Sequence, residues 1–285
     1  MQGLKKLSVF DYVNYAIMLL LMLITFYPFW IQLVISISTK EAYFSSVFHL
    51  IPVSFSLDTY KYAFSEPMIT RATAISVLVT VLGTSLSLLL TSMGAYPLSK
   101  KSLKGRNVIF FLIVITMFFD GGLIAWYILI NSLGLSNTIL AFFIPGAVST
   151  YNLILMKNYY TKIPESLEES AKVDGYNDIR IFFLIILPSS KPIFATITLF
   201  YSVSFWNDFF TPMLFTTNNK LYPLSLVLRN LIVSSQNMHA KSLEFQISDM
   251  VRGAVIVISI VPIMLVYPFI QKHFVQGIML GAVKE

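Results

Sequence analysis

The chain has 285 residues, of which 56% are hydrophobic and 12% are charged, and its formal net charge is +6. A mean hydropathy of +0.74 lies far above that of soluble domains and indicates a polytopic membrane protein. The absence of cysteine excludes disulfides, thiolate metal sites and a cysteine nucleophile, and the positive charge does not imply nucleic acid, because basic residues gather in the cytoplasmic loops of membrane proteins.

Six segments are long and apolar enough to cross a membrane, which takes roughly 20 residues of helix. They are residues 13–37, 72–97, 107–130, 138–157, 192–214 and 251–271. The first follows Lys5 and Lys6 as a signal peptide would, but it is too long and lacks a cleavage pattern, so we expect it to be retained. The sequence predicts an all-α polytopic membrane protein in which residues 1–285 form a single domain.

The short polar link at residues 99–107 sets the predicted orientation, because four basic side chains crowd into it. Basic loops stay in the cytoplasm, so this link faces inward, and an even number of spans places both termini there as well. On this topology the inward segments hold thirteen Lys and Arg residues and the outward segments hold seven.

The outward segments differ in size. Residues 131–137, NSLGLSN, predict a tight uncharged hairpin, whereas residues 38–71 and 215–250 are long enough for structure of their own. Within the first long segment, SLDTYKYAF begins with Ser56 as a cap and Asp58 in the first turn. This pattern predicts a short interfacial helix with Leu57, Tyr60 and Phe64 on one face.

The longest inward segment, residues 158–191, carries the densest group of charges. Pro164 suits a helix start, acidic residues follow in the first turn, and Gly175 is a natural stop, so residues 164–174 should form a short helix. A second helix should begin at Asn177 or Asp178 and end or bend at Pro188 and Pro192. By pattern alone, a solvated amphipathic loop is the commoner explanation.

The residue order in this segment points to a more specific role. It closely resembles the EAA loop of ABC-importer permeases, which runs Glu-Ala-Ala, three residues, Gly, nine residues, Ile, one residue, Leu-Pro. The matching positions here are Glu169, Ser170, Ala171, Gly175, Ile185, Leu187 and Pro188. The one departure is Ser170, where the family usually has alanine, and serine is also small.

Other segments extend the resemblance from the first span to the last residue. SFWNDFFTPMLF (residues 204–215), YPLSLVLRNL (residues 222–231) and the C-terminal segment from residue 261 resemble the carbohydrate-uptake branch, particularly the second, smaller permease of the maltose importer. FFDGGLI (residues 118–124) and IPESLEESAKVDG (residues 163–175) are similar to relatives that import complex oligosaccharides.

The resemblance implies a type I ABC importer permease fold in a multi-pass protein of the bacterial inner (cytoplasmic) membrane. The implied partners are a second, different permease subunit, two ATPase subunits that hold ATP and Mg²⁺, and an extracytoplasmic solute-binding protein. This chain would form half of the pathway for an oligosaccharide, for which an acidic uronate fragment is one candidate. It would bind no cofactor or metal and would have no catalytic site.

The resemblance also implies roles for named residues. The charged segment would be a coupling helix that docks in the ATPase, with Glu169, Ser170, Ala171, Asp174 and Gly175 at the contact. The C-terminal tail GAVKE would reach the ATPase interface, and residues 215–250 would touch the binding protein.

Ionisable residues inside spans are expensive and usually face a cavity or a partner. Asp208 lies beside Trp206 and Asn207, a combination that suits sugar rings and hydroxyls, although Asn207 and Asp208 would equally serve to join neighbouring helices. Asp120 precedes Gly121 and Gly122, and for it we favour a structural role over the substrate pathway. Tyr151 and Asn152 are weaker pathway candidates.

Two other function classes fit the sequence less well. A secondary transporter driven by an ion gradient would normally need buried ionisable relays and symmetric halves, and neither is visible. A membrane-embedded enzyme would need a motif such as HExxH, which the chain lacks, and no Walker sequence for ATP hydrolysis is present. The three histidines lie outside the predicted spans without metal-ligand spacing.

Overall fold

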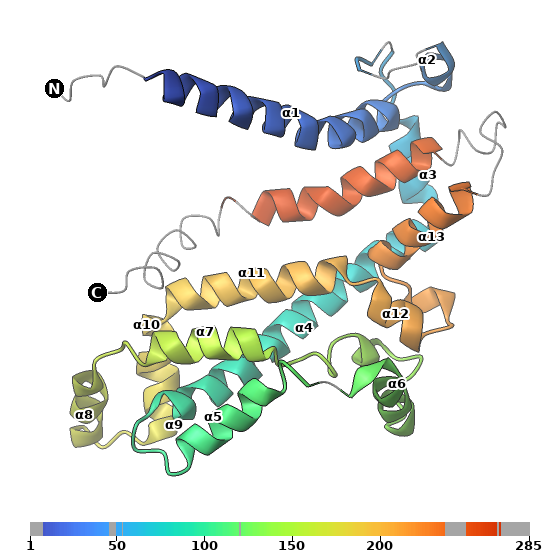
Figure 1. Cartoon of the computed structure of the whole chain (residues 1–285). Coiled ribbons are helices and arrows are strands. Elements are labelled where there is room, and N and C mark those ends of the chain that lie inside the picture. Colours follow the sequence, from blue (N-terminus) through green and yellow to red (C-terminus); the bar gives the residue numbers. More distant parts are fainter. Residues whose placement is uncertain are drawn as a thin grey trace. The chain divides into compact units, whose positions relative to one another are not determined.

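The computed structural model of the chain describes residues 8–45, 50–52, 54–119, 121–236, 249–266 and 268. These residues form helices and connecting segments without any strand, and one isolated antiparallel bridge joins Ser38 to Phe55. The all-α prediction is therefore confirmed for this part of the chain (Figure 1). The chain divides into two compact units, Met1–Thr70 with Asn230–Ile260 and Arg71–Arg229 with Val261–Glu285.

The first unit contains the long helix α1 (Val9–Ser36). A capping box starts it, because the Ser8 N–H donates to Asp11 Oδ2 at 2.7 Å and the Asp11 N–H donates to Ser8 Oγ at 3.4 Å. The 28 residues exceed the length that a hydrocarbon core of roughly 30 Å requires. Burial within the unit is limited to the last turn, so the rest of this apolar helix is suited to contact with lipid.

Two short helices, α2 (Lys40–Ser45) and α3 (Asp58–Ser65), follow in the same unit. The predicted short helix is confirmed as α3, and its position at the membrane interface stays a prediction. Its N-cap residue is Leu57 instead of Ser56, although the Asp58 N–H donates to Ser56 Oγ at 3.0 Å. Ala63 is buried in this helix, whereas Leu57 and Phe64 of the predicted face are exposed. The Tyr60 hydroxyl lies 2.9 Å from Ser36 Oγ, which joins α3 to the end of α1.

A buried polar cluster joins α2 to the helix Asp249–Val266 within this unit. The Tyr43 hydroxyl donates to Asp249 Oδ2 at 2.8 Å, and Asp249 also forms an ion pair with Arg252. Burial raises the pKa of Tyr43, while the positive charge of Arg252 opposes that rise. Because Asp249 is almost fully buried, its two partners supply the compensation that a buried carboxylate needs.

The second unit contains α4 (Pro67–Ser99) from residue 71 onward, together with the elements that follow it. These are α5 (Arg106–Ile115), α6 (Gly122–Ser132), the 3₁₀ helix η1 (Ile139–Phe142), α7 (Thr150–Tyr160), α8 (Glu165–Val173), α9 (Asp178–Ile181), the π-helix η2 (Phe182–Ile186), α10 (Leu187–Ser189), α11 (Lys191–Asn207), α12 (Phe210–Phe215), the 3₁₀ helix η3 (Asn219–Leu221) and α13 (Leu224–Gln236), whose last residues belong to the first unit.

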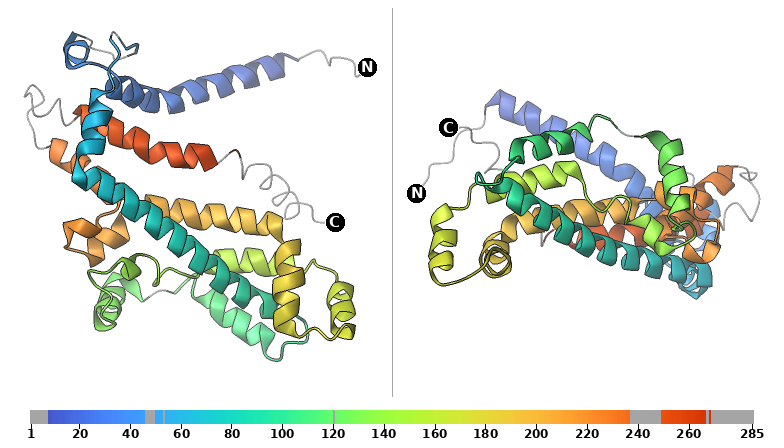
Figure 2. Two further views of the ribbon diagram at one scale, coloured as in Figure 1. Left: turned by 180° about the vertical axis from the view of Figure 1, so that it is seen from behind. Right: turned by 90° about the horizontal axis from the view of Figure 1, so that it is seen from below.

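The larger hydrophobic core of this unit joins α4, α7, α8, η2 and α11. In Figures 1 and 2, α7 and α11 run side by side and α4 lies against them. Two hydroxyl pairs reinforce this packing, since Thr91 Oγ1 lies 2.6 Å from the Tyr201 hydroxyl and Ser92 Oγ lies 2.6 Å from the Tyr160 hydroxyl. Thr91 and Ser92 on α4 thus bond to α11 and α7 respectively.

A smaller core joins α4, α6, η1 and α12 around Phe142 and Phe215. Near it, α4 and α11 approach so closely that a Cβ at Gly83 would lie 2.9 Å from a ring carbon of Phe205. A glycine at this position therefore permits the contact between the two helices.

Three of the predicted spans are wrong as continuous helices. The third, 107–130, is divided into α5, which ends at Ile115, and α6, which begins at Gly122 with a φ of 73°. The fourth, 138–157, is α-helical only in α7, because it begins with the short 3₁₀ helix η1 and residues 143–149, with Pro145 and Gly146 among them, are irregular. The fifth, 192–214, breaks at Asp208, where α11 ends and α12 follows.

Three helices in the described part of the chain are long and apolar enough to cross a membrane: α1, α4 and Asp249–Val266. A fourth span results if Asp178–Ser189 and Lys191–Asn207, which meet at 83°, are counted together. This bend confirms the predicted effect of Pro188 and Pro192. The predicted sixth span extends beyond the described residues, and both the count of six and the side of the termini stay predictions.

Candidate functional site

The charged segment at residues 158–191, which the sequence predicts to face the cytoplasm, folds as a helix, a turn and a second helix, as predicted. Pro164 is the N-cap of α8 instead of its first helical residue. At the other end, the Tyr176 N–H donates to the Ala171 carbonyl at 3.0 Å, and Gly175 has a φ of 82°. This left-handed residue ends the helix in the way that favours glycine. The Asn177 side chain then accepts the Arg180 N–H at 2.9 Å and starts the second helix.

Most of α8 is exposed. Of the residues proposed for the ATPase contact, Glu169, Ser170, Asp174 and Gly175 are exposed, whereas Ala171 packs into the larger core. The Ser170 hydroxyl donates to the Ser166 carbonyl at 2.8 Å, so serine satisfies its own hydrogen bond where the family usually has alanine. The exposed face is therefore small, acidic and accessible to a partner.

Glu168 is the charged residue of α8 that faces inward. Its side chain forms an ion pair with Lys100, the residue after α4, and it accepts the Tyr96 hydroxyl at 3.4 Å. Sequence reasoning assigned Glu168 only a general effect on the helix dipole. The sequence did indicate that Glu168 could face inward, because it is three residues from Ala171 and shares its helical face. It did not indicate the partner, because Lys100 lies 68 positions away in the sequence.

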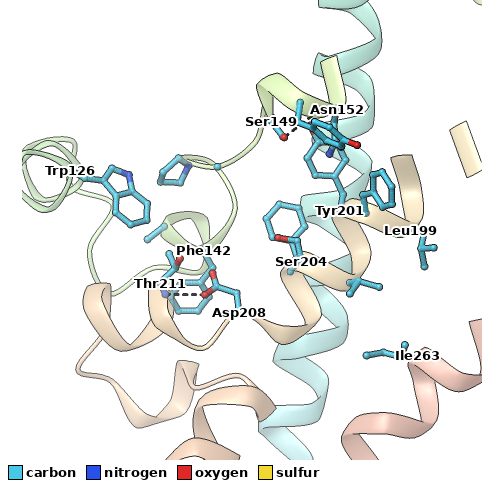
Figure 3. A pocket seen from close by; sticks show the side chains of 17 residues that line it. Trp126, Phe142, Ser149, Asn152, Leu199, Tyr201, Ser204, Asp208, Thr211 and Ile263 are labelled. Atoms are coloured by element: carbon cyan, nitrogen blue, oxygen red, sulfur yellow. Dashed lines mark hydrogen bonds between the residues drawn. The ribbon is translucent and has the colours of Figure 1, made fainter. Parts of the chain in front are cut away.

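A second candidate site is a cavity of about 810 Å³ in the second unit. Aromatic side chains and hydroxyl groups from the segments around α6, η1, α7, α11 and α12 form its wall (Figure 3). The residues that line it are Trp126, Ala141, Phe142, Pro145, Gly146, Ser149, Tyr151, Asn152, Leu199, Phe200, Tyr201, Val203, Ser204, Phe205, Asp208, Thr211 and Ile263. Aromatic rings and scattered polar groups are typical of a small-molecule site.

Asp208 lies in the wall of this cavity, but its carboxylate is already engaged. Its Oδ1 accepts the N–H groups of Phe210 at 3.0 Å and Thr211 at 3.1 Å, and thereby caps α12; Figure 3 shows the bond to Thr211. Its backbone carbonyl accepts the Ser225 hydroxyl at 2.7 Å. These two bonds show that Asp208 caps α12, whether or not it also contacts a substrate.

The other two residues of the predicted group do not line this cavity. Trp206 is buried and lines a separate space of about 70 Å³ with Pro262 and Val266. Asn207 is exposed, and its Nδ2 donates to the Val203 carbonyl at 2.9 Å within α11. Neighbouring residues of a helix face different directions, so Trp206 and Asp208 do not line the same cavity, and a part for Trp206 in the substrate pathway stays a prediction.

Tyr201 and Phe205 are wall residues that sequence reasoning missed. The Tyr201 hydroxyl accepts the Ser149 N–H at 2.9 Å, and Figure 3 shows its ring beside Ser149 and Asn152. Tyr201 and Phe205 stack at 6.3 Å between ring centroids, and they follow the four-residue spacing of one helical face. This spacing is the feature of the sequence that could have identified the two residues as a pair on one face. The weaker candidates Tyr151 and Asn152 do line the cavity.

The remaining predictions concern other parts of the chain. Asp120, the three histidines, and the C-terminal tail lie outside the described residues. Within the described residues, no group of three or more His, Asp or Glu side chains is placed to hold a metal ion.

Comparisons with known proteins identify the family. Residues 83–280, more than half of the chain, match the family described as "binding-protein-dependent transport system inner membrane component". The chain is 43% identical to the polygalacturonan/rhamnogalacturonan transport system permease protein YtcP of Bacillus subtilis (strain 168), over 98% of this chain and 99% of that protein. It is 40% identical to protein LplC of the same organism, over 100% of this chain and 98% of that protein.

A solved structure gives the same result. One chain in the crystal structure of a bacterial ABC transporter involved in the import of the acidic polysaccharide alginate superposes with a TM-score of 0.87. It shares 32% sequence identity, and the match covers 95% of this chain and 100% of that one. The chain described here therefore belongs to the family of inner membrane components of binding-protein-dependent transport systems, the permease subunits of ABC importers.

Proposed function

We propose that the chain is one of two different permease subunits of an ATP-driven importer that carries an acidic oligosaccharide across the bacterial cytoplasmic membrane. The other proposed parts are two ATPase subunits, which hold ATP and Mg²⁺, and a solute-binding protein outside the membrane. The observation that carries the proposal is α8, an exposed acidic helix held to the protein by one inward face.

In this proposal, α8 docks in a cleft of the ATPase. Glu169 is exposed and available to a cation or an amide of the partner, while the positive φ at Gly175 allows the chain to turn sharply away from the contact. Closure of the nucleotide-bound ATPase would displace α8. The contact between α8 and the ATPase would shift the permease between two conformations because its binding energy differs between them. Proton transfer is not required of these residues.

The proposed topology has six crossings and cytoplasmic termini. Long apolar helices α1, α4 and Asp249–Val266 support three crossings, and the basic link after α4 supports the orientation. The proposal assigns two further crossings to the broken segment α5 to α6 and to α7 with the residues before it. The remaining crossing is assigned to the predicted span 192–214, which contains most of α11 and of α12.

The proposed substrate class follows from two relatives and from the cavity wall. The named substrates of those relatives are polygalacturonan, a polymer of galacturonic acid, and the acidic polysaccharide alginate. Trp126, Tyr201 and Phe205 offer rings to the apolar faces of sugars, while Ser149 and Ser204 offer hydroxyl groups.

The wall of the cavity carries little charge that would attract a carboxylate. Among the described residues that line it, Asp208 is the one with a formal charge, and that charge is negative. A uronate oligosaccharide therefore needs cations from another source. We infer that this subunit contacts rings and hydroxyls of the substrate, and that the second permease supplies the positive groups.

Reconstitution tests the proposed function. Proteoliposomes that contain this chain, the second permease and the ATPase subunits should take up oligogalacturonides only when ATP is inside and the binding protein is outside. A neutral malto-oligosaccharide serves as the control substrate and should be taken up far less. Uptake by this chain alone under an ion gradient, or uptake without ATP, would contradict the proposal.

A further inference from the structure

The inward face of α8 is unusual because it contains a carboxylate. Glu168 and Ala171 are 8% and 4% exposed, whereas Leu167, at 46%, and Val173, at 88%, are open to solvent. A buried carboxylate is costly without a partner, and it persists where a cation and further hydrogen bonds compensate it. Glu168 has both.

Its two partners come from the same end of α4. Lys100 forms the ion pair with Glu168, and the Lys100 ammonium also lies 4.7 Å from the centroid of the Tyr96 ring. The Tyr96 hydroxyl donates to the second oxygen of Glu168 at 3.4 Å. Three groups thus contact one another pairwise, and they fasten α8 to α4.

The Tyr96 ring is itself held by other elements. Its centroid lies 5.3 Å from that of Phe182 in η2 and 6.3 Å from that of Tyr160 in α7. Tyr160 is fully buried and bonds to Ser92 of α4 at 2.6 Å. The attachment point of α8 is therefore a packed junction, which transmits displacement better than a solvated loop does.

From this junction, α4 leads to the cavity. Thr91, five residues before Tyr96, bonds to the Tyr201 hydroxyl at 2.6 Å. Tyr201 lines the cavity and accepts the Ser149 N–H from the start of α7. A movement of α4 would therefore act on two parts of the cavity wall through these two hydrogen bonds.

The other ion pair near α8 offers a contrast. Lys172 Nζ lies 3.1 Å from Asp178 Oδ1, but the two side chains are 56% and 73% exposed. Solvent weakens such a pair, so it cannot hold α8 firmly. Among the described residues of this segment, the buried pair is the one suited to transmit force.

We propose that the Glu168 and Lys100 ion pair is the joint that transmits displacement of α8 to α4, and that both are positioning residues for transport. The inference rests on the proposed docking of α8 to the ATPase. When the joint is absent, α8 still occupies its cleft but moves relative to α4, so ATP is hydrolysed with less transport.

The test uses the assembled importer in proteoliposomes. The double variant Lys100→Met with Glu168→Gln leaves no unpaired charge in the protein interior, which limits the effect on folding. We expect it to assemble and to lower the ratio of sugar transported to ATP hydrolysed by roughly tenfold, a size that coupling mutations reach. The swapped variant Lys100→Glu with Glu168→Lys should recover most of the ratio. Lys101→Met removes an exposed charge from the same link and should leave the ratio unchanged.

Two outcomes would contradict the proposed joint, and a third would contradict the proposed docking of α8 to the ATPase. An assembled neutral double variant with an unchanged ratio would overturn the joint. Loss of assembly in that double variant would also overturn it, because the pair would then serve folding. A cross-link between α8 and the ATPase, measured in the unsubstituted permease background, reports separately on docking. Its absence would overturn the proposed function itself.

Discussion

Thr91 Oγ1 and the Tyr201 hydroxyl lie 2.6 Å apart in the buried contact between α4 and α11. The same hydroxyl accepts the Ser149 N–H at 2.9 Å, so one oxygen joins α4, α11 and the start of α7. A hydrogen bond of this kind specifies how the three helices pack, because leaving its partners unsatisfied is costly.

Tyr201→Phe should therefore lower the free energy of unfolding by about 1–3 kcal/mol, since it leaves the buried Thr91 hydroxyl and the half-buried Ser149 N–H without their bond. Thermal unfolding of the purified complex measures this. Thr91→Val removes the other partner, and the double variant should show non-additive losses, with a coupling energy of about 0.5–3 kcal/mol. Strictly additive losses would mean that the two hydroxyls act independently.

Asp208 caps α12 through its Oδ1, and this geometry separates two roles that the sequence left open. Asp208→Asn keeps an acceptor oxygen and removes the charge, whereas Asp208→Ala removes both. We expect the Ala variant to lose about 1 kcal/mol of stability, as lost caps do, and the Asn variant to stay close to the parent in stability and uptake. A large loss of uptake in the stable Asn variant would instead show that the charge serves the substrate.

Asn137 joins two segments of the second unit. Its Oδ1 accepts the Thr217 N–H at 2.8 Å and the hydroxyls of Thr216 and Thr217 at 3.1 and 3.2 Å, while its φ is 59°. Asn137→Ala should cost about 1–3 kcal/mol, because it removes these bonds and places alanine in the left-handed region.

Asn137→Asp is the matched variant, since it keeps the acceptor oxygen and also tolerates a positive φ. Thermal unfolding of the two variants should therefore separate them clearly, with the Asp variant close to the parent. Equal losses in both would show that the amide nitrogen, not Oδ1, holds the segment at residues 215–218.

Gly175 ends α8 with a φ of 82°, and a Cβ added there would meet nothing within 4 Å. The cost of substitution thus comes from the backbone, at about 1–3 kcal/mol for a β-branched residue in this region. Gly175→Val should reorient the chain after α8 and lower transport per ATP hydrolysed, whereas Gly175→Asn should be tolerated. The ratio of the two rates in proteoliposomes is the measurement. A fully coupled Val variant would mean that the turn has no part in docking.

The start and stop of α8 could be predicted because their causes are local. Proline before the helix and glycine after it act within a few residues. The partner of Glu168 could not, because Lys100 is distant in sequence and no local rule selects it. The same limit applies to Tyr201, whose partner Thr91 lies on another helix.

The continuous spans were the least accurate prediction. Hydropathy reports how apolar a segment is, but not whether its backbone stays helical. The helix in residues 107–130 stops at Ile115 and resumes only at Gly122, which has a positive φ, and Asp208 ends α11 by binding the next amides itself. The placement of Trp206 away from Asp208 has a related cause, since neighbours in sequence diverge around a helix.

The docking of α8 to the ATPase is the central claim, and a cysteine cross-link tests it most directly. The chain has no cysteine of its own, so Ser170→Cys introduces a unique thiol on the exposed face of α8, and Ser132→Cys in the last turn of α6 is the control. With a second cysteine in the ATPase cleft, we predict that position 170 cross-links within the assembled importer and that position 132 does not. If position 170 fails to cross-link and reacts with a membrane-impermeant thiol reagent added outside intact cells, the account is contradicted.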